Sequence, residues 1–207
     1  MNHTAPARAE ARRAPRLVLV GLAVVIAGII GTLGYQSVSS SATSFGDVLR
    51  GDHHGALGKA DGLVPDGASV FDDEIPAVAN LDPSLLNALR RAATDAAKDG
   101  VEIQVNSGWR SPEYQEQLLR EAVSEYGSEE EAARWVATAI TSAHVSGDAV
   151  DIGPFDATAW LSEHGAHYGL CQIYRNESWH YELRPEATSR GCPLMNADPT
   201  HDPRMQQ

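Results

Sequence analysis

The chain has 207 residues, a formal charge of -12 at pH 7 and a hydrophobic share of 43%. This length suits one domain of about 100 to 150 residues with appendages, and the composition excludes collagen, a coiled coil and wholesale disorder. The first 16 residues carry four arginines against one glutamate, so everything after them sums to -15. Such an acidic body repels phosphate backbones, which argues against a nucleic-acid partner.

The N-terminus has the organisation of a membrane anchor. Residues 1–16 contain the arginine cluster, and residues 17–35, LVLVGLAVVIAGIIGTLGY, carry no charge. As a helix this stretch spans about 28 Å, close to the hydrocarbon thickness of a bilayer. Because arginines stay in the cytoplasm, we predict a cytoplasmic N-terminus and a single-pass cell-membrane protein whose body lies outside. The small residues of SVSSSATS leave a cleaved signal peptide open, and both alternatives export the domain.

The next segment reads as a linker. Residues 36–78 are rich in Ser, Gly, Asp and Ala and show no sustained apolar period, so we expect a stalk. Its GDHHG stretch, residues 51–55, has no carboxylate or cysteine spaced to complete a metal site, and a solvated linker is the interpretation there. The folded domain is therefore predicted over 79–192, with a polar, proline-rich C-terminal tail over 193–207.

The predicted domain begins with a helix followed by a strand. Asp82 is a suitable N-cap for a helix in NLDPSLLNALRRAATDAAKDG, and Gly100 ends it. The segment VEIQVNSGWRS then alternates Val101, Ile103 and Val105 with polar residues. This period of two predicts a strand with one buried face.

Two further helices are expected next. Ser111, followed by a proline, starts one of them, and the SEEE capping box at 128–131 opens the other. The second of these is predicted to bury Trp135, Val136 and Ile140.

The last part of the domain contains a short helix, capped by Asp156, and then two strands. The strands are YGLCQIY and WHYELR, joined by the turn RNES. Helices come first and strands cluster later, so the predicted fold class is α+β: a small antiparallel sheet with helices packed on one face, forming a single domain.

The two cysteines, Cys171 and Cys192, both lie in the exported part. In an oxidising compartment, a disulfide that closes a loop of about 20 residues stabilises a fold by roughly 3 kcal/mol. The alternative, thiolate ligands for a metal, lacks the CxxC spacing that would support it. We therefore predict a disulfide.

The segment SAHVSGDAVDIGP, residues 142–154, contains candidate metal ligands. Its two glycines, β-branched residues and proline disfavour a helix. A turn at Gly147 lets His144 approach from one side, while DAVDI forms a strand with Val150 and Ile152 on the core side and Asp151 on the other. Taken singly, His144 would more often be a hydrogen-bonded structural histidine.

The segment ESWHYE offers the rest of a site, because catalytic zinc usually has three protein ligands and one open position. In a strand, His180 and Glu182 would face the site while Trp179, Tyr181 and Leu183 face the core. Glu177, in the turn that precedes this strand, could lie over the open position of the metal. Either glutamate could be the general base, and the local pattern does not separate them.

Three motifs resemble those of the zinc D,D-peptidases, which include the VanY-type D-alanyl-D-alanine carboxypeptidases. SAHVSGDAVD matches S-x-H-x-x-G-x-A-x-D, and ESWH matches E-x-W-H. SGWRSPEYQ, residues 107–115, resembles an upstream motif that bears an arginine and a glutamine. The motifs fall in the family's order across residues 79–184, over half of the chain.

The resemblance implies an activity and a cofactor. A member of this family would be a zinc D-alanyl-D-alanine carboxypeptidase that removes the terminal D-Ala from peptidoglycan stem peptides ending in D-Ala-D-Ala. A D,D-dipeptidase or an L,D-endopeptidase of the same family stays open as an alternative. So does a noncatalytic, zinc-containing wall-binding module, although a pure binder would need no general base.

The resemblance also implies roles for individual residues. By this resemblance, the metal ligands for Zn²⁺ would be His144, Asp151 and His180, and the general base would be Glu177. Its substrate-binding residues are Arg110, which would receive the terminal carboxylate, together with Ser142 and Gln115 in the same pocket. Glu182 is assigned to the surroundings of the site or to the surface. The alternatives are an ion-pair role for Arg110, a turn cap for Ser142 and a helix-surface position for Gln115.

Overall fold

The computed structural model describes residues 57–206. The predicted cytoplasmic segment 1–16, the anchor or signal 17–35 and the stalk up to residue 56, with its paired histidines, lie outside the described residues. Among the helices of the described part, none has both the length and the apolar character needed to cross a membrane.

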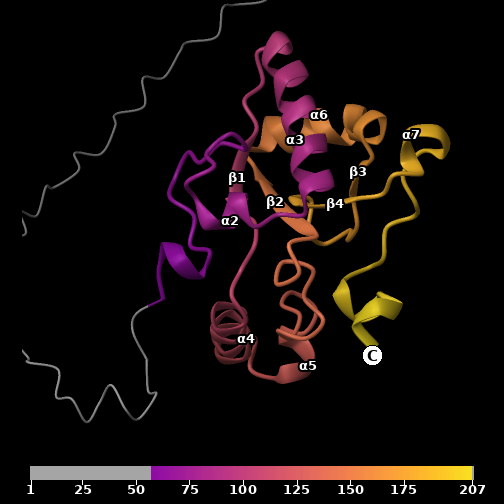
Figure 1. Ribbon diagram of the computed structural model, residues 1–207. Coiled ribbons are helices and arrows are strands. Elements are labelled where there is room, and N and C mark those ends of the chain that lie inside the picture. Colours follow the sequence, from indigo (N-terminus) through magenta and orange to yellow (C-terminus); the bar gives the residue numbers. More distant parts are fainter. Residues whose placement is uncertain (1–56, 207) are drawn as a thin grey trace, which may run out of the picture. The chain divides into compact units, whose positions relative to one another are not determined.

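A four-stranded sheet forms the centre of the domain, and all its neighbouring strands are antiparallel (Figure 1). The strand order is β1-β2-β4-β3, with β1 at Gln104–Ser107, β2 at Ala149–Gly153, β4 at His180–Leu183 and β3 at Leu170–Gln172. The first strand starts later than predicted, although Ile103 and Val105 are both buried as expected.

The longest core helix, α3, spans Pro83–Ala96 and continues as a 3-10 turn to Gly100. Asp82 caps it as predicted, because its Oδ1 accepts hydrogen bonds from the backbone N–H groups of Ser84 and Leu85 at 2.8 and 3.1 Å. Its buried side chains belong to the same hydrophobic cluster as those of the sheet.

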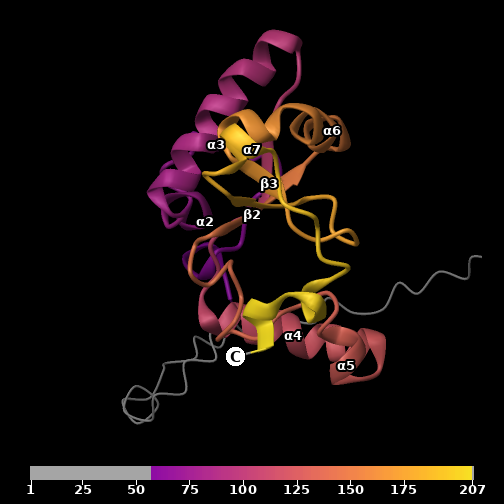
Figure 2. The ribbon, with the colours of Figure 1, turned by 90° about the vertical axis from the view of Figure 1, so that its right-hand side faces the viewer.

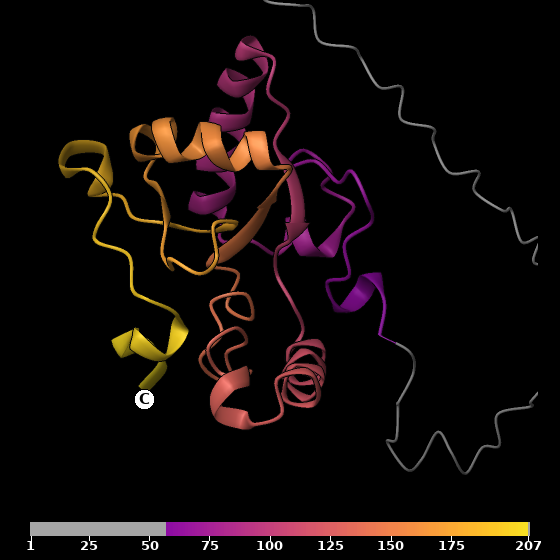
Figure 3. The ribbon, with the colours of Figure 1, turned by 180° about the vertical axis from the view of Figure 1, so that it is seen from behind.

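Helices cover one face of the sheet, which confirms the predicted architecture. α6, at Phe155–His164, packs beside α3 over this face (Figure 3). Val150, Ile152 and Tyr181 point from the sheet into the shared hydrophobic core, where they meet Leu161 of α6. Because side chains alternate along a strand, Asp151 and His180 must lie on the opposite face.

Two helices stand away from the core, as Figure 2 shows. α4, at Pro112–Tyr126, begins with the predicted cap: Ser111 Oγ accepts a hydrogen bond from the N–H of Tyr114 at 3.1 Å. The helix opened by SEEE, α5, is only Glu129–Ala132. The predicted burial of Trp135 and Ile140 is therefore wrong: they are 38% and 94% exposed, because the chain leaves the helix before reaching them.

The domain begins earlier than the predicted boundary at residue 79. Val70 is fully buried, Ser69 forms a bridge with Gln104 of β1, and the short helix α2, at Pro76–Ala79, buries two of its side chains in the core. The predicted stalk thus extends too far. Its sparse apolar residues form no sustained period, so pattern alone does not reveal that they join the core.

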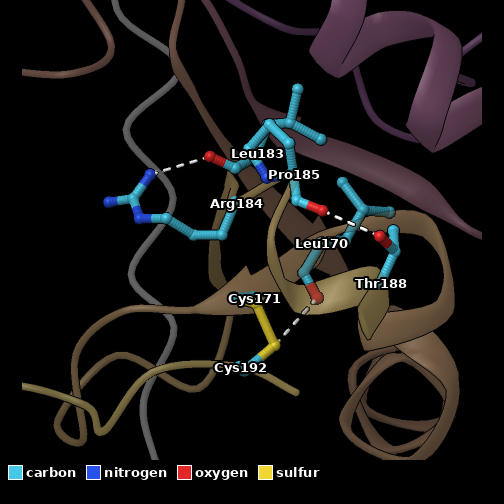
Figure 4. The surroundings of a disulfide bond; sticks show 7 residues. All are labelled: Leu170, Cys171, Leu183, Arg184, Pro185, Thr188 and Cys192. Carbon is cyan, nitrogen blue, oxygen red and sulfur yellow. Dashed lines mark hydrogen bonds between the residues drawn. A yellow bond between two sulfur atoms is a disulfide. The ribbon is translucent and has the colours of Figure 1, made fainter. Parts of the chain in front are cut away.

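The C-terminal segment is also part of the domain. After α7, at Ala187–Arg190, the predicted disulfide joins Cys192 to Cys171 of β3 (Figure 4). The N–H of Asn196 then donates to the carbonyl of Ile173 at 2.9 Å, and two 3-10 helices follow, at Pro199–His201 and Pro203–Gln206. The expectation of a loose tail over 193–207 is therefore wrong for the part of it that the structure describes, up to residue 206.

Candidate metal centre

A glycine turn places the first candidate ligand, as predicted. Gly147 has a φ of +80°, and a Cβ there would lie 2.5 Å from the carbonyl oxygen of Asn80. Its own carbonyl accepts a hydrogen bond from the N–H of Asp82 at 2.8 Å. Glycine is needed both for the backbone conformation and for the close approach of the α2–α3 connection. The turn lies between His144 and β2, which begins at Ala149.

The sheet places the other two candidate ligands. Asp151 of β2 stands opposite His180 of β4 in the antiparallel register, so both side chains extend from the same face. β2 is buried along its whole length.

Three ligand atoms converge on one point. His180 Nδ1 lies 3.2 Å from Asp151 Oδ1, His144 Nε2 lies 3.4 Å from the same oxygen, and the two nitrogens are 3.3 Å apart. A tetrahedral ion about 2.0 to 2.1 Å from its ligands holds them about 3.3 to 3.4 Å from one another. The three side chains therefore fit a zinc-sized ion without rearrangement.

Hydrogen bonds on the far side of each imidazole fix its orientation. His144 Nδ1 lies 2.8 Å from the carbonyl oxygen of Gly108, and His180 Nε2 lies 3.3 Å from Glu182 Oε1. Each acceptor takes the proton of the remote nitrogen, which leaves the lone pair of the other nitrogen for a metal.

The charges of the cluster are strongly perturbed. Burial lowers the pKa of His144. Burial opposes the charge of His180 as well, but its hydrogen bonds to Asp151 and Glu182 outweigh that and raise its pKa to about 9. Burial alone would raise the pKa of Asp151, but the neighbouring histidines and Arg110 hold this pKa well below the ordinary value. Because a histidine ligand must be neutral, metal binding at His180 competes with protonation of its imidazole.

The structure separates the two candidate bases. Glu177 Oε2 lies 3.7 Å from His180 Nδ1, on the metal-facing side, whereas Glu182 contacts the far nitrogen of the ring. The other oxygen of Glu177 is buried without a hydrogen-bond partner in the described residues, and burial raises the pKa of this carboxyl to about 7. The role of Glu177 as general base stays a prediction, and its position on the metal-facing side of His180 is compatible with that role.

The predicted substrate-binding residues meet at the same place. Arg110 donates to Asp151 Oδ2 at 2.8 Å, to Ser107 Oγ at 2.7 Å and to Gln115 Oε1 at 3.1 Å. A guanidinium has five N–H donors, so these three bonds leave two of them, and Arg110 lines the cleft described below. Gln115 is only 1% exposed, which excludes its helix-surface alternative. Ser142 Oγ accepts a hydrogen bond from the N–H of His144 at 3.3 Å, so a turn-capping role is observed for it.

A cleft of about 390 Å³ opens over the cluster. Besides the ligands and Glu177, it is lined by α4, by the irregular segment after α5 and by Trp179. Trp179 is 39% exposed, so its predicted core position is wrong: β4 begins only at His180, and the strand alternation does not extend back to it. His164, a rival ligand by residue type, instead lies against Trp160 with 4.5 Å between ring centroids.

Sequence reasoning missed the partners of Glu182. This carboxylate is 1% exposed and accepts from Arg184 Nη2 at 2.6 Å and from Arg204 Nη1 at 2.7 Å. Arg204 is 22 residues downstream, in the segment expected to be a tail, and no local pattern signals such a contact.

A buried His/Asp/His cluster at the floor of a cleft, with a carboxylate beside the open position, is the arrangement of a metal-dependent hydrolase. The family model described as VanY: D-alanyl-D-alanine carboxypeptidase matches residues 78–186, more than half of the chain. The chain belongs to this family, which confirms the resemblance seen in its motifs.

Known relatives agree with this assignment. A D-alanyl-D-alanine carboxypeptidase of Enterococcus faecalis is 34% identical, over 42% of this chain and 42% of its own length. The structure of VanYB in complex with D-alanine-D-alanine is 29% identical, covering 53% of this chain and 75% of the other, with a TM-score of 0.50. The structure of the LdcB LD-carboxypeptidase, 24% identical over 64% of this chain and 72% of its own, shares the fold with a TM-score of 0.50.

Proposed function

We propose that this chain is a zinc-dependent D-alanyl-D-alanine carboxypeptidase that hydrolyses the terminal D-Ala from peptidoglycan stem peptides. The observation that carries the proposal is the set of three ligand atoms, 3.2 to 3.4 Å from one another, with Glu177 beside them. Membership of the VanY family supports the reaction, and the complex of VanYB with D-alanine-D-alanine supports the substrate class.

Zinc is the metal that the donor set favours, since two imidazoles and one carboxylate suit it better than they suit magnesium or calcium. Bound there, it would act as a Lewis acid toward a water and toward the carbonyl of the substrate. The carboxylate–histidine contact from Glu182 to His180 and the carbonyl contact to His144 hold the ligands ready for it.

Glu177 is proposed as the group that moves the proton. Its buried Oε1, which has no hydrogen-bond partner within residues 57–206, and a pKa raised to about 7 by burial suit a carboxyl that accepts a proton from the attacking water and returns it to the leaving amine. Glu182 does not suit this role, because both of its oxygens are engaged by arginines and it contacts the far side of His180.

Arg110 is proposed to bind the terminal carboxylate of the substrate. Hydrogen bonds to Ser107 and Gln115 fix its guanidinium plane at the wall of the cleft, with donors remaining for a carboxylate. Recognition of a free C-terminus at this point restricts hydrolysis to the last peptide bond.

The size of the cleft favours a peptide substrate over a free dipeptide. A second cavity of about 590 Å³ adjoins the first, and the two share Val136, Ala137, Pro199 and Met205 in their walls. Together they offer room for a stem that extends beyond the two terminal D-Ala residues.

An extracytoplasmic location is proposed as well, with the domain held at the cell membrane by residues 17–35. The uncharged stretch after the arginine cluster supports this, as does the disulfide between Cys171 and Cys192, because such bonds persist in oxidising compartments. Protease added to intact cells should digest the domain, and a protected domain would contradict the proposal.

The activity is tested with the purified chain and a peptide that ends in Lys-D-Ala-D-Ala, by measuring free D-Ala. We expect release by the zinc-loaded protein, loss with a chelator and recovery when zinc is restored. Glu177→Ala should lower turnover by about 10²- to 10⁴-fold, whereas Glu102→Ala, at an exposed position in the described domain, should not change it.

Three outcomes would change the conclusion. If the zinc-loaded protein released no D-Ala, the carboxypeptidase reaction would be wrong and a noncatalytic wall-binding module would take its place. Release of the intact dipeptide would indicate a dipeptidase. If Glu182→Ala abolished turnover without loss of metal while Glu177→Ala did not, the general base would be misassigned.

A further inference from the structure

The C-terminal segment 198–206, which lies beyond the end of the family match at residue 186, contacts the surroundings of the metal ligands. Arg204 is the centre of this contact. Its Nη1 donates to Glu182 Oε2 at 2.7 Å and its Nη2 donates to Glu182 Oε1 at 3.0 Å, so the guanidinium binds both oxygens of one carboxylate.

The same carboxylate holds a metal ligand. Glu182 Oε1, which accepts from Arg204, also lies 3.3 Å from the Nε2 atom of His180. Only 1% of the side chain of Glu182 is exposed, and removing the cation partner of a buried carboxylate leaves an uncompensated charge, which is strongly destabilising. Arg204 therefore fixes the atom that in turn fixes His180.

A second path from the same segment reaches the other side of His180. Tyr174 lies against this imidazole with 5.1 Å between ring centroids, and its hydroxyl donates to Asp202 Oδ2 at 3.0 Å. Asp202 accepts in turn from Arg204 Nε at 3.1 Å. The contacts form a closed ring: His180 to Glu182, Arg204, Asp202, Tyr174 and back to His180.

We propose that Arg204 is a positioning residue of the metal site, acting through Glu182 to hold the imidazole of His180 so that Nδ1 faces Asp151 and His144. This inference rests on the metal site proposed above. It extends that site by a segment that the three motifs do not contain.

The contacts of Glu182 indicate what the loss of Arg204 would do. Without Arg204, the arginine that stays paired with Glu182 among the described residues is Arg184, whose side chain is 29% exposed and which donates to Oε2 rather than to the oxygen facing His180. The carboxylate can then turn toward Arg184, and His180 loses the acceptor that defines its ring orientation. Removal of such an outer partner typically costs about 10- to 100-fold in metal affinity.

The experiment measures zinc affinity by competition with a chromophoric chelator, using the full chain. Arg204→Gln removes the charge and Arg204→Lys keeps it but loses the two-pronged geometry. The side chain of Arg204 is 43% exposed, so neither change opens a cavity in the core. Arg190→Gln, at an exposed position of α7, is the matched control.

We expect the dissociation constant for zinc to rise about 10- to 100-fold in Arg204→Gln, by a smaller factor in Arg204→Lys, and not at all in the control. Circular dichroism reports whether each variant keeps the fold. A dissociation constant within twofold of the parent in a folded Arg204→Gln protein would overturn the proposal.

A second measurement reports on His180 directly and needs no variant that might fail to fold. In the zinc-loaded parent chain, NMR should show the Nε2 proton of His180 bound to nitrogen and slow to exchange with solvent, because it is donated to a buried carboxylate. Rapid exchange would overturn the proposal, whereas a proton on Nδ1 would contradict the ligand set of the proposed function. Failure of the parent to bind zinc at all would instead contradict the proposed function.

Discussion

Replacement of Gly147 tests how strictly the turn before β2 determines the metal site. The residue has a φ of +80°, and an alanine Cβ would lie 2.5 Å from the Asn80 carbonyl oxygen, closer than any real contact. The left-handed conformation alone costs a non-glycine residue about 1 to 2 kcal/mol. The clash with backbone atoms adds to this, because the α2–α3 connection must move away.

Gly127 provides a matched control for the conformational part. It caps α4 with a φ of +83°, but a Cβ there meets nothing within 4 Å. Gly127→Ala should therefore lower the free energy of unfolding by about 1 to 2 kcal/mol. Gly147→Ala should lower it further, because its Cβ also clashes with the backbone of Asn80. Urea denaturation of the metal-free proteins measures both differences.

The zinc affinity of the same proteins completes the test. Gly147→Ala displaces His144 relative to Asp151, so we expect weaker zinc binding in that variant and unchanged binding in Gly127→Ala. If the two variants were equally destabilised and bound zinc equally well, the close approach to Asn80 would not position the ligand, and the reasoning would be refuted.

Three other changes should have measurable effects. Cys192→Ser opens a loop of 21 residues and should lower the free energy of unfolding by about 3 kcal/mol, measured by denaturation under oxidising conditions; an unchanged midpoint would contradict this. Arg110→Lys should reduce kcat/KM for a peptide with a free C-terminus by about 10- to 100-fold, because a lysine cannot bind both carboxylate oxygens. An unchanged zinc affinity would separate lost substrate binding from damage to Asp151, and an unchanged kcat/KM would contradict the prediction. Burial opposes the charge of Asp198, but hydrogen bonds from Thr200 and His201 lower its pKa to about 2. The ionised carboxylate therefore stabilises the folded protein fully above the ordinary pKa of an aspartate, and this stabilisation is lost as the pH falls toward 2. Asp198→Asn should therefore cost about 2 kcal/mol at pH 7, and this deficit should shrink between about pH 4 and pH 2; a deficit independent of pH would contradict the assignment.

The parts of the site that could be predicted from sequence are those built by short-range rules. The alternation of DAVDI determines which side of the strand Asp151 occupies, and a glycine in the preceding turn indicates a reversal that brings His144 back. The cap of α3 at Asp82 is local in the same way. In each case the cause lies within a few residues of the effect.

The parts that could not be predicted depend on contacts distant in sequence. Val70 joins the core although its neighbours show no apolar period, and Arg204 contacts Glu182 although the two residues are 22 positions apart in the sequence. The failure at α5 has a related cause: a capping box determines where a helix starts, not how long it runs. Ile140, beyond its end, is almost fully exposed.

The distribution of arginines over the buried carboxylates explains why one of them is suited to be the base. Asp151 is paired with Arg110, and Glu182 is paired with Arg184 and Arg204. Within the described residues, the ion-pair contact of Glu177 is to His180 alone, at 3.7 Å, and that imidazole is proposed to be occupied by the metal. Burial therefore acts on Glu177 with little opposition and raises its pKa, while the paired carboxylates stay ionised. Carboxyl groups of similar pKa in the unfolded chain thus acquire different pKa values in the fold, because arginines pair with Asp151 and Glu182 but, within residues 57–206, not with Glu177, the proposed base.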